Sequence, residues 1–161
     1  MNIEEFNENV FTKIGKQWML ISAGNKDEVN AMTASWGGMG VLWNKNVVYI
    51  FVRPQRYTKH LIDENSHFAI SFFPEEARKM LAYMGKASGK DEDKIAHSNL
   101  HVIQGHAPYF EEAAQVMICR KLYAQELDPA CFIDTQVDHI SYPEKDYHIL
   151  YVGEIEQILT K

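Results

Sequence analysis

Cysteine is scarce in this sequence. Its 161 residues include two, Cys119 and Cys131, and these do not form a CxxC pair. Zinc knuckles and dithiol motifs, which need closely spaced cysteines, are therefore not supported. Cys119 lies within the apolar run 116–119, so we expect it to be a buried, unreactive thiol.

The sequence also lacks long apolar runs and an excess of positive charge. No run approaches the ~20 apolar residues that cross a bilayer, and the acidic segment 1–11 contains no apolar signal core. There are 16 basic against 22 acidic residues, a net charge of -6. Proteins that bind nucleic acid carry a basic stripe. We therefore expect a cytoplasmic protein that binds neither nucleic acid nor membrane.

Familiar catalytic arrangements are missing as well. No Ser-His-Asp or Cys-His arrangement can be recognised. His97, His101 and His106 lie close together in the sequence, but Asn99 and Gly105 interrupt any helix across them, which disfavours a metal site. The pattern is typical of a protein whose cofactor carries the chemistry.

The hydrophobic content of 46% and the length are typical of one folded domain, residues 1–161. Apolar runs predict strands over 18–23, 30–36, 47–52, 67–73, 113–124, 131–140 and 148–158. Helical spacing predicts helices over 3–14, stopping at Gly15, and over 58–64, 75–83 and about 93–97. We expect a bend at 37–38 and an irregular segment at 102–110. Most connections are too short for parallel crossovers, so these elements predict a mainly β protein, an antiparallel barrel with short helices.

The stretch 47–64 is the most informative. Its strand ends at Pro54, which has no N–H to donate, and a helix begins near Thr58. Arg53 and Arg56 lie in between. A helix start favours an anion, and the arginine fork matches phosphate oxygens. The stretch indicates a phosphate clamp; the alternative is a surface turn with two solvated arginines.

A second informative stretch is the strand 30–36. Thr33 and Ser35 present hydroxyls on one face, Asn30 adds an amide, and Trp36 follows at a glycine pair. Small polar groups beside a large aromatic ring suit a flat ligand with a phosphate tail. The alternative is a barrel strand whose hydroxyls face solvent.

The loop 85–94 is polar and contains glycine. Ser88 and Gly89 offer a hydroxyl and a backbone N–H, and the loop carries the cations Lys86, Lys90 and Lys94. It can close over the same site, or be an ordinary solvated loop.

Four segments in this order resemble the flavin reductase-like, FMN-binding split-barrel family, and above all its flavoredoxin branch. They are residues 30–36 (NAMTASW), 53–58 (RPQRYT), 88–94 (SGKDEDK) and 148–155 (HILYVGEI). Together they span nearly the whole chain.

The resemblance implies a six-stranded antiparallel Greek-key split barrel and a homodimer with FMN near the subunit interface. It places His148 near the flavin or the reductant. Lys90 stands where the family commonly has arginine, so no phosphate contact is assigned to it. Residues 134–146 match no family pattern. The implied FMN contacts are Asn30, Met32, Thr33, Ala34, Ser35, Trp36, Arg53, Arg56, Tyr57, Thr58, Ser88 and Lys94.

The sequence thus leads to an FMN-binding oxidoreductase as the first hypothesis. Electrons would pass from NAD(P)H through FMN to a small-molecule or protein acceptor, and the protein would supply positioning and electrostatics without a catalytic side chain. An alternative is a non-catalytic FMN electron carrier reduced by a protein partner. A third is a split-barrel module that holds no flavin or binds another ligand such as haem.

Overall fold

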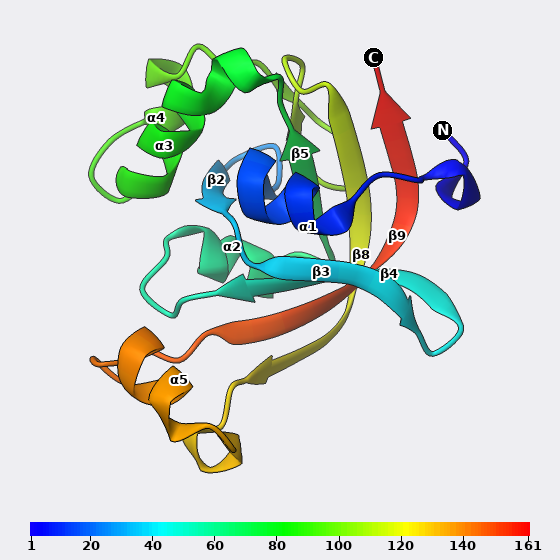
Figure 1. Ribbon diagram of the computed structural model, residues 1–161. Helices are drawn as coiled ribbons and strands as arrows, with labels where there is room; N and C mark the ends of the chain where they lie inside the picture. Colours follow the sequence, from blue (N-terminus) through cyan, green and yellow to red (C-terminus); the bar gives the residue numbers. More distant parts are fainter.

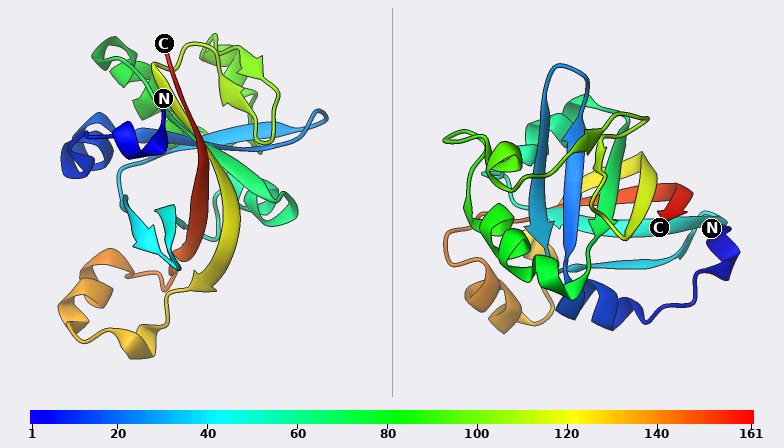
Figure 2. Two further views of the ribbon diagram at one scale, coloured as in Figure 1. Left: turned by 90° about the vertical axis from the view of Figure 1, so that its right-hand side faces the viewer. Right: turned by 90° about the horizontal axis from the view of Figure 1, so that it is seen from above.

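The computed structural model describes residues 1–161 and is built on one curved sheet of seven antiparallel strands. In spatial order these are β2, β1, β5, β8, β9, β4 and β3. Figure 2 shows that β1 and β2 cross β3 and β4 steeply, so the sheet curls into an open barrel. The strands are β1 (Met19–Gly24), β2 (Val29–Ala34), β3 (Gly37–Leu42), β4 (Lys45–Val52), β5 (His67–Phe72), β8 (Gln115–Glu126) and β9 (Ile149–Thr160).

The barrel interior is the main hydrophobic core, to which all the strands except β3 contribute buried side chains. On β4, Val48, Ile50 and Val52 are buried in this core, since alternate residues of a strand share one face. Phe51 lies between them and faces the other side, where it lines a cleft described below. Cys119 is fully buried in the core, as expected, and burial raises the pKa of its thiol.

The longest pair, β8 and β9, bends because its register shifts twice, after Ile118 and after Lys121. On β9, Gly153 lies against the ring of Phe68 from β5. A Cβ at this glycine would fall 2.6 Å from Cζ of Phe68, closer than packed carbon atoms approach. Because Gly153 has no side chain, the ring of Phe68 can occupy this space in the core.

Short helices lie around the barrel (Figure 1). Helices α3 (Arg78–Lys86) and α4 (Lys94–His97) pack on a second apolar cluster, and α2 (Thr58–Glu64) follows β4. The segment carrying α5 (Thr135–Ser141) projects away from the barrel. No helix has the length and apolar content needed to cross a membrane. The remaining short elements are η1 (Ile3–Glu5), α1 (Val10–Thr12), η2 (Lys13–Gln17), η3 (Glu75–Ala77), η4 (Pro129–Cys131), β6 (Val102–Ile103) and β7 (Tyr109–Phe110).

The expected mainly β antiparallel fold is confirmed, but the strand predicted over 131–140 is wrong. That segment forms η4 and α5 instead. Ile133, Val137 and Ile140 follow helical spacing and are exposed, and Asp134 caps α5 by accepting a hydrogen bond from the Gln136 amide. The β-branched composition concealed this helical period.

Two further predictions need correction. The helix over 3–14 exists only as η1 and α1, and Gly15 lies inside η2 rather than ending a helix. Its apolar residues still pack against the core, which explains their spacing. The bend at 37–38 is the start of β3, an edge strand paired with β4. This additional strand brings the sheet to seven strands rather than six.

We expect Gly153→Ala to lower the free energy of unfolding by about 1–3 kcal/mol, the usual cost of an extra methyl group in a packed core. Gly40→Ala is the matched control, because its Cβ would lie 3.9 Å from the Tyr49 ring, an ordinary contact. Urea denaturation of both variants measures the difference. Equal stabilities would show that Phe68 moves aside freely.

Candidate functional site

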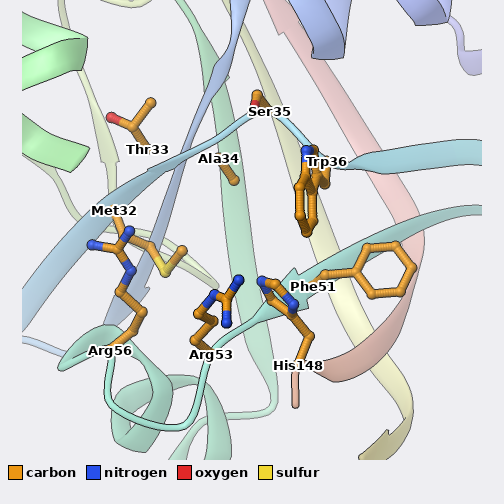
Figure 3. A pocket seen from close by; sticks show the side chains of 9 residues that line it. All are labelled: Met32, Thr33, Ala34, Ser35, Trp36, Phe51, Arg53, Arg56 and His148. Atoms are coloured by element: carbon orange, nitrogen blue, oxygen red, sulfur yellow. The ribbon is translucent and has the colours of Figure 1, made fainter. Parts of the chain in front are cut away.

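Two adjoining hollows lie where β2, the end of β4 and the loop 85–94 meet. Their volumes are about 200 Å³ and about 320 Å³, and both are lined by Met32, Arg53 and Arg56. Together they fall within the size range of small-ligand sites. The first, shown in Figure 3, is also lined by Thr33, Ala34, Ser35, Trp36, Phe51 and His148. The second is also lined by Gln55, Tyr57, Thr58, Lys86, Ala87, Ser88, Gly89 and Lys94.

Larger hollows exist elsewhere, but they lack buried charge. One of about 700 Å³ lies beside Lys16 and Arg78, which are both exposed. Another of about 700 Å³ lies between α1 and β3, and no charged residue lines it. The convergence of buried polar groups therefore singles out the two adjoining hollows.

The second hollow is a cationic pocket built on the C-terminal end of α3. Arg56 donates to the carbonyl of Gly85 over 2.8 Å. Lys94, only 3% exposed, donates to the carbonyls of Met84 and Ala87 over 3.0 Å each. These carbonyls have no partner within the helix, so they can accept hydrogen bonds from the two cations. Neither cation forms an ion pair with a carboxylate.

The pKa values of the two cations reflect this environment. Burial, together with the positive charge of Arg56, lowers the pKa of Lys94 to about 8, and Glu92 opposes this shift. Burial and the charge of Arg53 lower the pKa of Arg56. Both shifts show that positive charge here lacks compensation, and a bound anion would provide it. This end of the site suits a phosphate group.

Arg53 is placed differently from Arg56. Its guanidinium forms an ion pair with Asp146 at 2.7 Å and donates to the Ser141 carbonyl at 3.0 Å. It also lies over the ring of Tyr142, 5.1 Å from the centroid. The charge of Arg53 is thus already neutralised by the segment that follows α5. Of the two arginines expected to form the clamp, both line the hollows, and only Arg56 has no carboxylate partner.

The first hollow has an aromatic wall. The indole of Trp36, 52% exposed, points toward His148, and their ring centroids are 5.3 Å apart (Figure 3). Phe51 meets the same imidazole edge-on at 6.4 Å. Burial, followed by the charge of Arg53, lowers the pKa of His148 to about 4, so its ring is neutral at physiological pH. This end suits a flat, largely uncharged ring.

The polar side chains predicted on β2 divide into two groups. Thr33 lines the first hollow but donates its hydroxyl to the Leu81 carbonyl at 2.6 Å. Asn30 lies beneath the site, outside both hollows, and donates to the Thr58 hydroxyl at 3.1 Å. The hydroxyl of Thr58 therefore binds β2 instead of capping α2. Ser35 lines the first hollow with no hydrogen-bond partner of its own.

The loop 85–94 closes against β2 at Gly89. A Cβ there would lie 2.7 Å from both Asn30 Nδ2 and Tyr57 Cδ1, so only glycine permits this approach. The Tyr57 hydroxyl is turned outward to Glu28, with which it shares a short hydrogen bond. Tyr57 therefore offers its ring to the pocket and supports the loop.

Apart from Asn30, every predicted contact residue lines one of the two hollows. Reasoning from the sequence missed Phe51 and Gln55, although both flank Arg53. It also missed Ala87, within the loop already singled out. Tyr142 and Asp146, which hold His148 and Arg53, lie in the segment that matched no pattern.

The three neighbouring histidines do not share a site. His97 contacts Glu92, and His106 stacks on His67. His101 approaches Glu112 on the surface, and with Glu111 these groups have ligand atoms within 4.8 Å of one another. Exposed groups of this kind are common without a metal ion.

Similar folds are found among solved structures. The flavoredoxin from Methanosarcina acetivorans has a TM-score of 0.70 at 24% identity, covering 98% of this chain and 74% of that one. For an FMN-binding protein from Thermus thermophilus, the TM-score is 0.68 at 19% identity, with coverages of 99% and 74%. An NADH:FAD oxidoreductase from Streptomyces globisporus has a TM-score of 0.67 at 16% identity, with coverages of 90% and 75%.

These TM-scores establish a common fold, the split barrel that the sequence resemblance implied. No curated protein matches the chain. The model of the family described as the flavin reductase like domain matches residues 11–161, nearly the whole sequence. The chain therefore belongs to the flavin reductase-like family.

Proposed function

We propose that this protein is an FMN-dependent oxidoreductase that passes electrons from a reduced nicotinamide to an acceptor. One observation carries the proposal: the half-buried Arg56 and the buried Lys94, two cations without carboxylate partners, lie in a pocket that adjoins an aromatic-walled cleft. A phosphate tail and a flat ring are the two chemical features that this pair of hollows accommodates. FMN combines both, and family membership supports it.

The phosphate end would be held by Arg56 and Lys94. Arg56 uses one donor on Gly85, and Lys94 uses two on carbonyls, so both retain donors for phosphate oxygens. Ser88, on the loop above, adds a hydroxyl. Because these groups are held by backbone carbonyls of α3, they are oriented before the ligand arrives.

The ring end would lie against Met32, Ala34 and Trp36, with Ser35 and Thr33 at the edge for the ribityl chain. The isoalloxazine, when bound, supplies the acceptance and release of electrons. The side chains of the cleft orient it and exclude water, while the neutral His148 adds no charge beside it. Arg53 holds the far wall in place through Asp146.

The nicotinamide donor is supported by one solved relative, which is described as an NADH:FAD oxidoreductase. A second function is favoured by a different observation. The net charge of -6 suits docking to a basic redox partner, and one structural relative is described as a flavoredoxin. In that case the protein would be an electron carrier reduced by its partner.

We also propose that two copies of the chain form a homodimer through the surface around β3. Phe11, Trp36, Val41 and Trp43 are between 52% and 89% exposed there. Phe11 and Trp36 line the same hollow beside β3, and exposed apolar side chains that lie close together indicate an interface. Trp36 belongs both to this surface and to the first hollow, so a second copy would close the cofactor cleft.

We expect Arg56→Ala to weaken FMN binding at least tenfold, through loss of a charge-assisted contact worth roughly 1.5–3 kcal/mol. Arg56→Lys keeps the charge without the fork and should give a smaller loss. Lys90→Ala removes a cation of the loop 85–94 that lies outside both hollows, and this variant should bind as the wild type does. Flavin fluorescence titration measures all four affinities. An unchanged dissociation constant for Arg56→Ala would remove Arg56 from the clamp.

An absorption spectrum under anaerobic conditions tests the function itself. We expect flavin bands that bleach on addition of NADH or NADPH, which would also identify the donor. Bands that persist with both donors and bleach with dithionite would favour the electron carrier. A colourless protein that takes up no added FMN would contradict both functions.

Sedimentation at micromolar concentration should show a dimer. Val41→Glu places a charge on the proposed interface and should shift the protein toward monomer without unfolding it, because Val41 is 71% exposed. Ile133→Glu alters a fully exposed apolar residue outside that surface and should leave the dimer intact. A monomeric wild type would refute the proposed interface.

A further inference from the structure

The segment that matched no family pattern places one side chain against a residue that lines the first hollow. Tyr142, at the C-terminal end of α5, places its hydroxyl oxygen 2.7 Å from Nδ1 of His148. Both residues are buried, with 4% and 7% of their surfaces exposed. No other acceptor lies within hydrogen-bond distance of the Tyr142 hydroxyl, and the His148 side chain makes no other hydrogen bond within the protein.

The surroundings decide which atom carries the hydrogen. Burial and the positive charges of Arg53 and Arg56 lower the pKa of His148, with Asp146 as the opposing group, so the ring is neutral. Burial raises the pKa of Tyr142, so its phenol keeps its hydrogen. A buried phenol hydrogen without an acceptor would cost free energy, and Nδ1 is its only acceptor. The Tyr142 hydroxyl therefore donates to Nδ1, which leaves the ring hydrogen on Nε2.

The remaining nitrogen, Nε2, has no partner within the protein. The imidazole lines the first hollow, between Arg53 and Trp36 in Figure 3. The rings of Trp36 and Phe51 restrict its rotation by packing on it at 5.3 and 6.4 Å. An N–H group without a partner thus belongs to the wall of the cleft, where a ligand oxygen can accept its hydrogen bond.

The charge near this group indicates which ligand oxygen fits. Asp146 neutralises Arg53 at 2.7 Å, and the neutral His148 adds no charge. Arg56 also lines the first hollow, but its guanidinium is held by the Gly85 carbonyl at the end of α3, and the buried Lys94 lines only the second hollow. A neutral carbonyl is therefore a better match for Nε2–H than a carboxylate, which would need a full countercharge.

We propose that Tyr142 is a positioning residue that holds His148 in the Nε2–H tautomer, from which His148 donates a hydrogen bond to the carbonyl oxygen of a neutral ring substrate. The carboxamide of a reduced nicotinamide has this chemistry. The identity of the substrate rests on the proposed function, whereas the tautomer depends only on the protein's own contacts. The segment that follows α5 thereby takes part in substrate recognition without touching the substrate.

The first test is ¹⁵N NMR of the histidine rings in the protein without added substrate. The His148 signals are assigned by their absence from His148→Asn. We expect one tautomer with hydrogen on Nε2, and a constant charge state from pH 5.5 to 8. In Tyr142→Phe, which removes only the hydroxyl, we expect a mixture of tautomers or an altered pKa.

Tyr147→Phe is the matched control. Tyr147 is buried in the same aromatic cluster, 4.9 Å from the Tyr142 ring, but its hydroxyl donates to Asp138. This variant loses the same atom from the same cluster and should leave the His148 signals unchanged. A wild-type ring with hydrogen on Nδ1 would overturn the proposal, as would identical His148 signals in Tyr142→Phe and the wild type.

The second test is kinetic and uses the FMN-loaded protein with its nicotinamide donor. We expect Tyr142→Phe to raise KM for the donor about fivefold with little change in kcat, and Tyr147→Phe to leave both unchanged. Equal KM values in Tyr142→Phe and the wild type would remove the substrate contact. If no donor reduces the protein, the proposed function fails, while the NMR result still decides the role of Tyr142.

Discussion

The site depends on how two cations, the half-buried Arg56 and the buried Lys94, are held at the C-terminal end of α3. The last turn of a helix leaves its carbonyls without partners, and the helix dipole places partial negative charge there. In this protein the carbonyls of Met84 and Gly85 accept hydrogen bonds from Lys94 and Arg56, respectively. Carbonyl dipoles orient the cations without cancelling their charge, so the positive field remains available for an anionic ligand. A carboxylate in the same place would have neutralised this positive charge.

The two arginines that flank Pro54 illustrate how neighbours along a chain acquire different tasks. Arg56 faces α3 and keeps its charge for the pocket. Arg53 is paired with Asp146, so its charge is cancelled and its guanidinium serves to attach the segment 127–148 to the barrel. The same segment supplies Tyr142 to His148. The segment outside the barrel therefore sets both the charge and the hydrogen-bond pattern around His148 and Arg53.

The regular elements were predictable where one local signal dominated. The run 47–52 is rich in β-branched and aromatic residues and ends at Pro54, and it forms β4. The helix over 58–64 has its apolar residues Leu61 and Ile62 on the buried side. Prediction failed where the composition of a segment and its apolar spacing indicated different structures, or where no apolar alternation was present. The segment 131–140 has the composition of a strand with the spacing of a helix, and β3 contains three glycines and no apolar alternation because it lies at the sheet edge.

The sequence by itself determined the class of fold and most of the residues that line the two adjoining hollows. These follow from local patterns, because strands, turns and charged loops are specified by neighbouring residues. Only the tertiary structure decided which of the two arginines remains without a carboxylate partner, since Asp146 and the Gly85 carbonyl reach Arg53 and Arg56 from distant parts of the chain. It also decided the tautomer of His148, which depends on burial and on a hydroxyl placed by packing. The pairing of a charge and the position of a ring hydrogen depend on which groups lie close together in three dimensions, and the spacing of residues in the sequence does not specify that proximity.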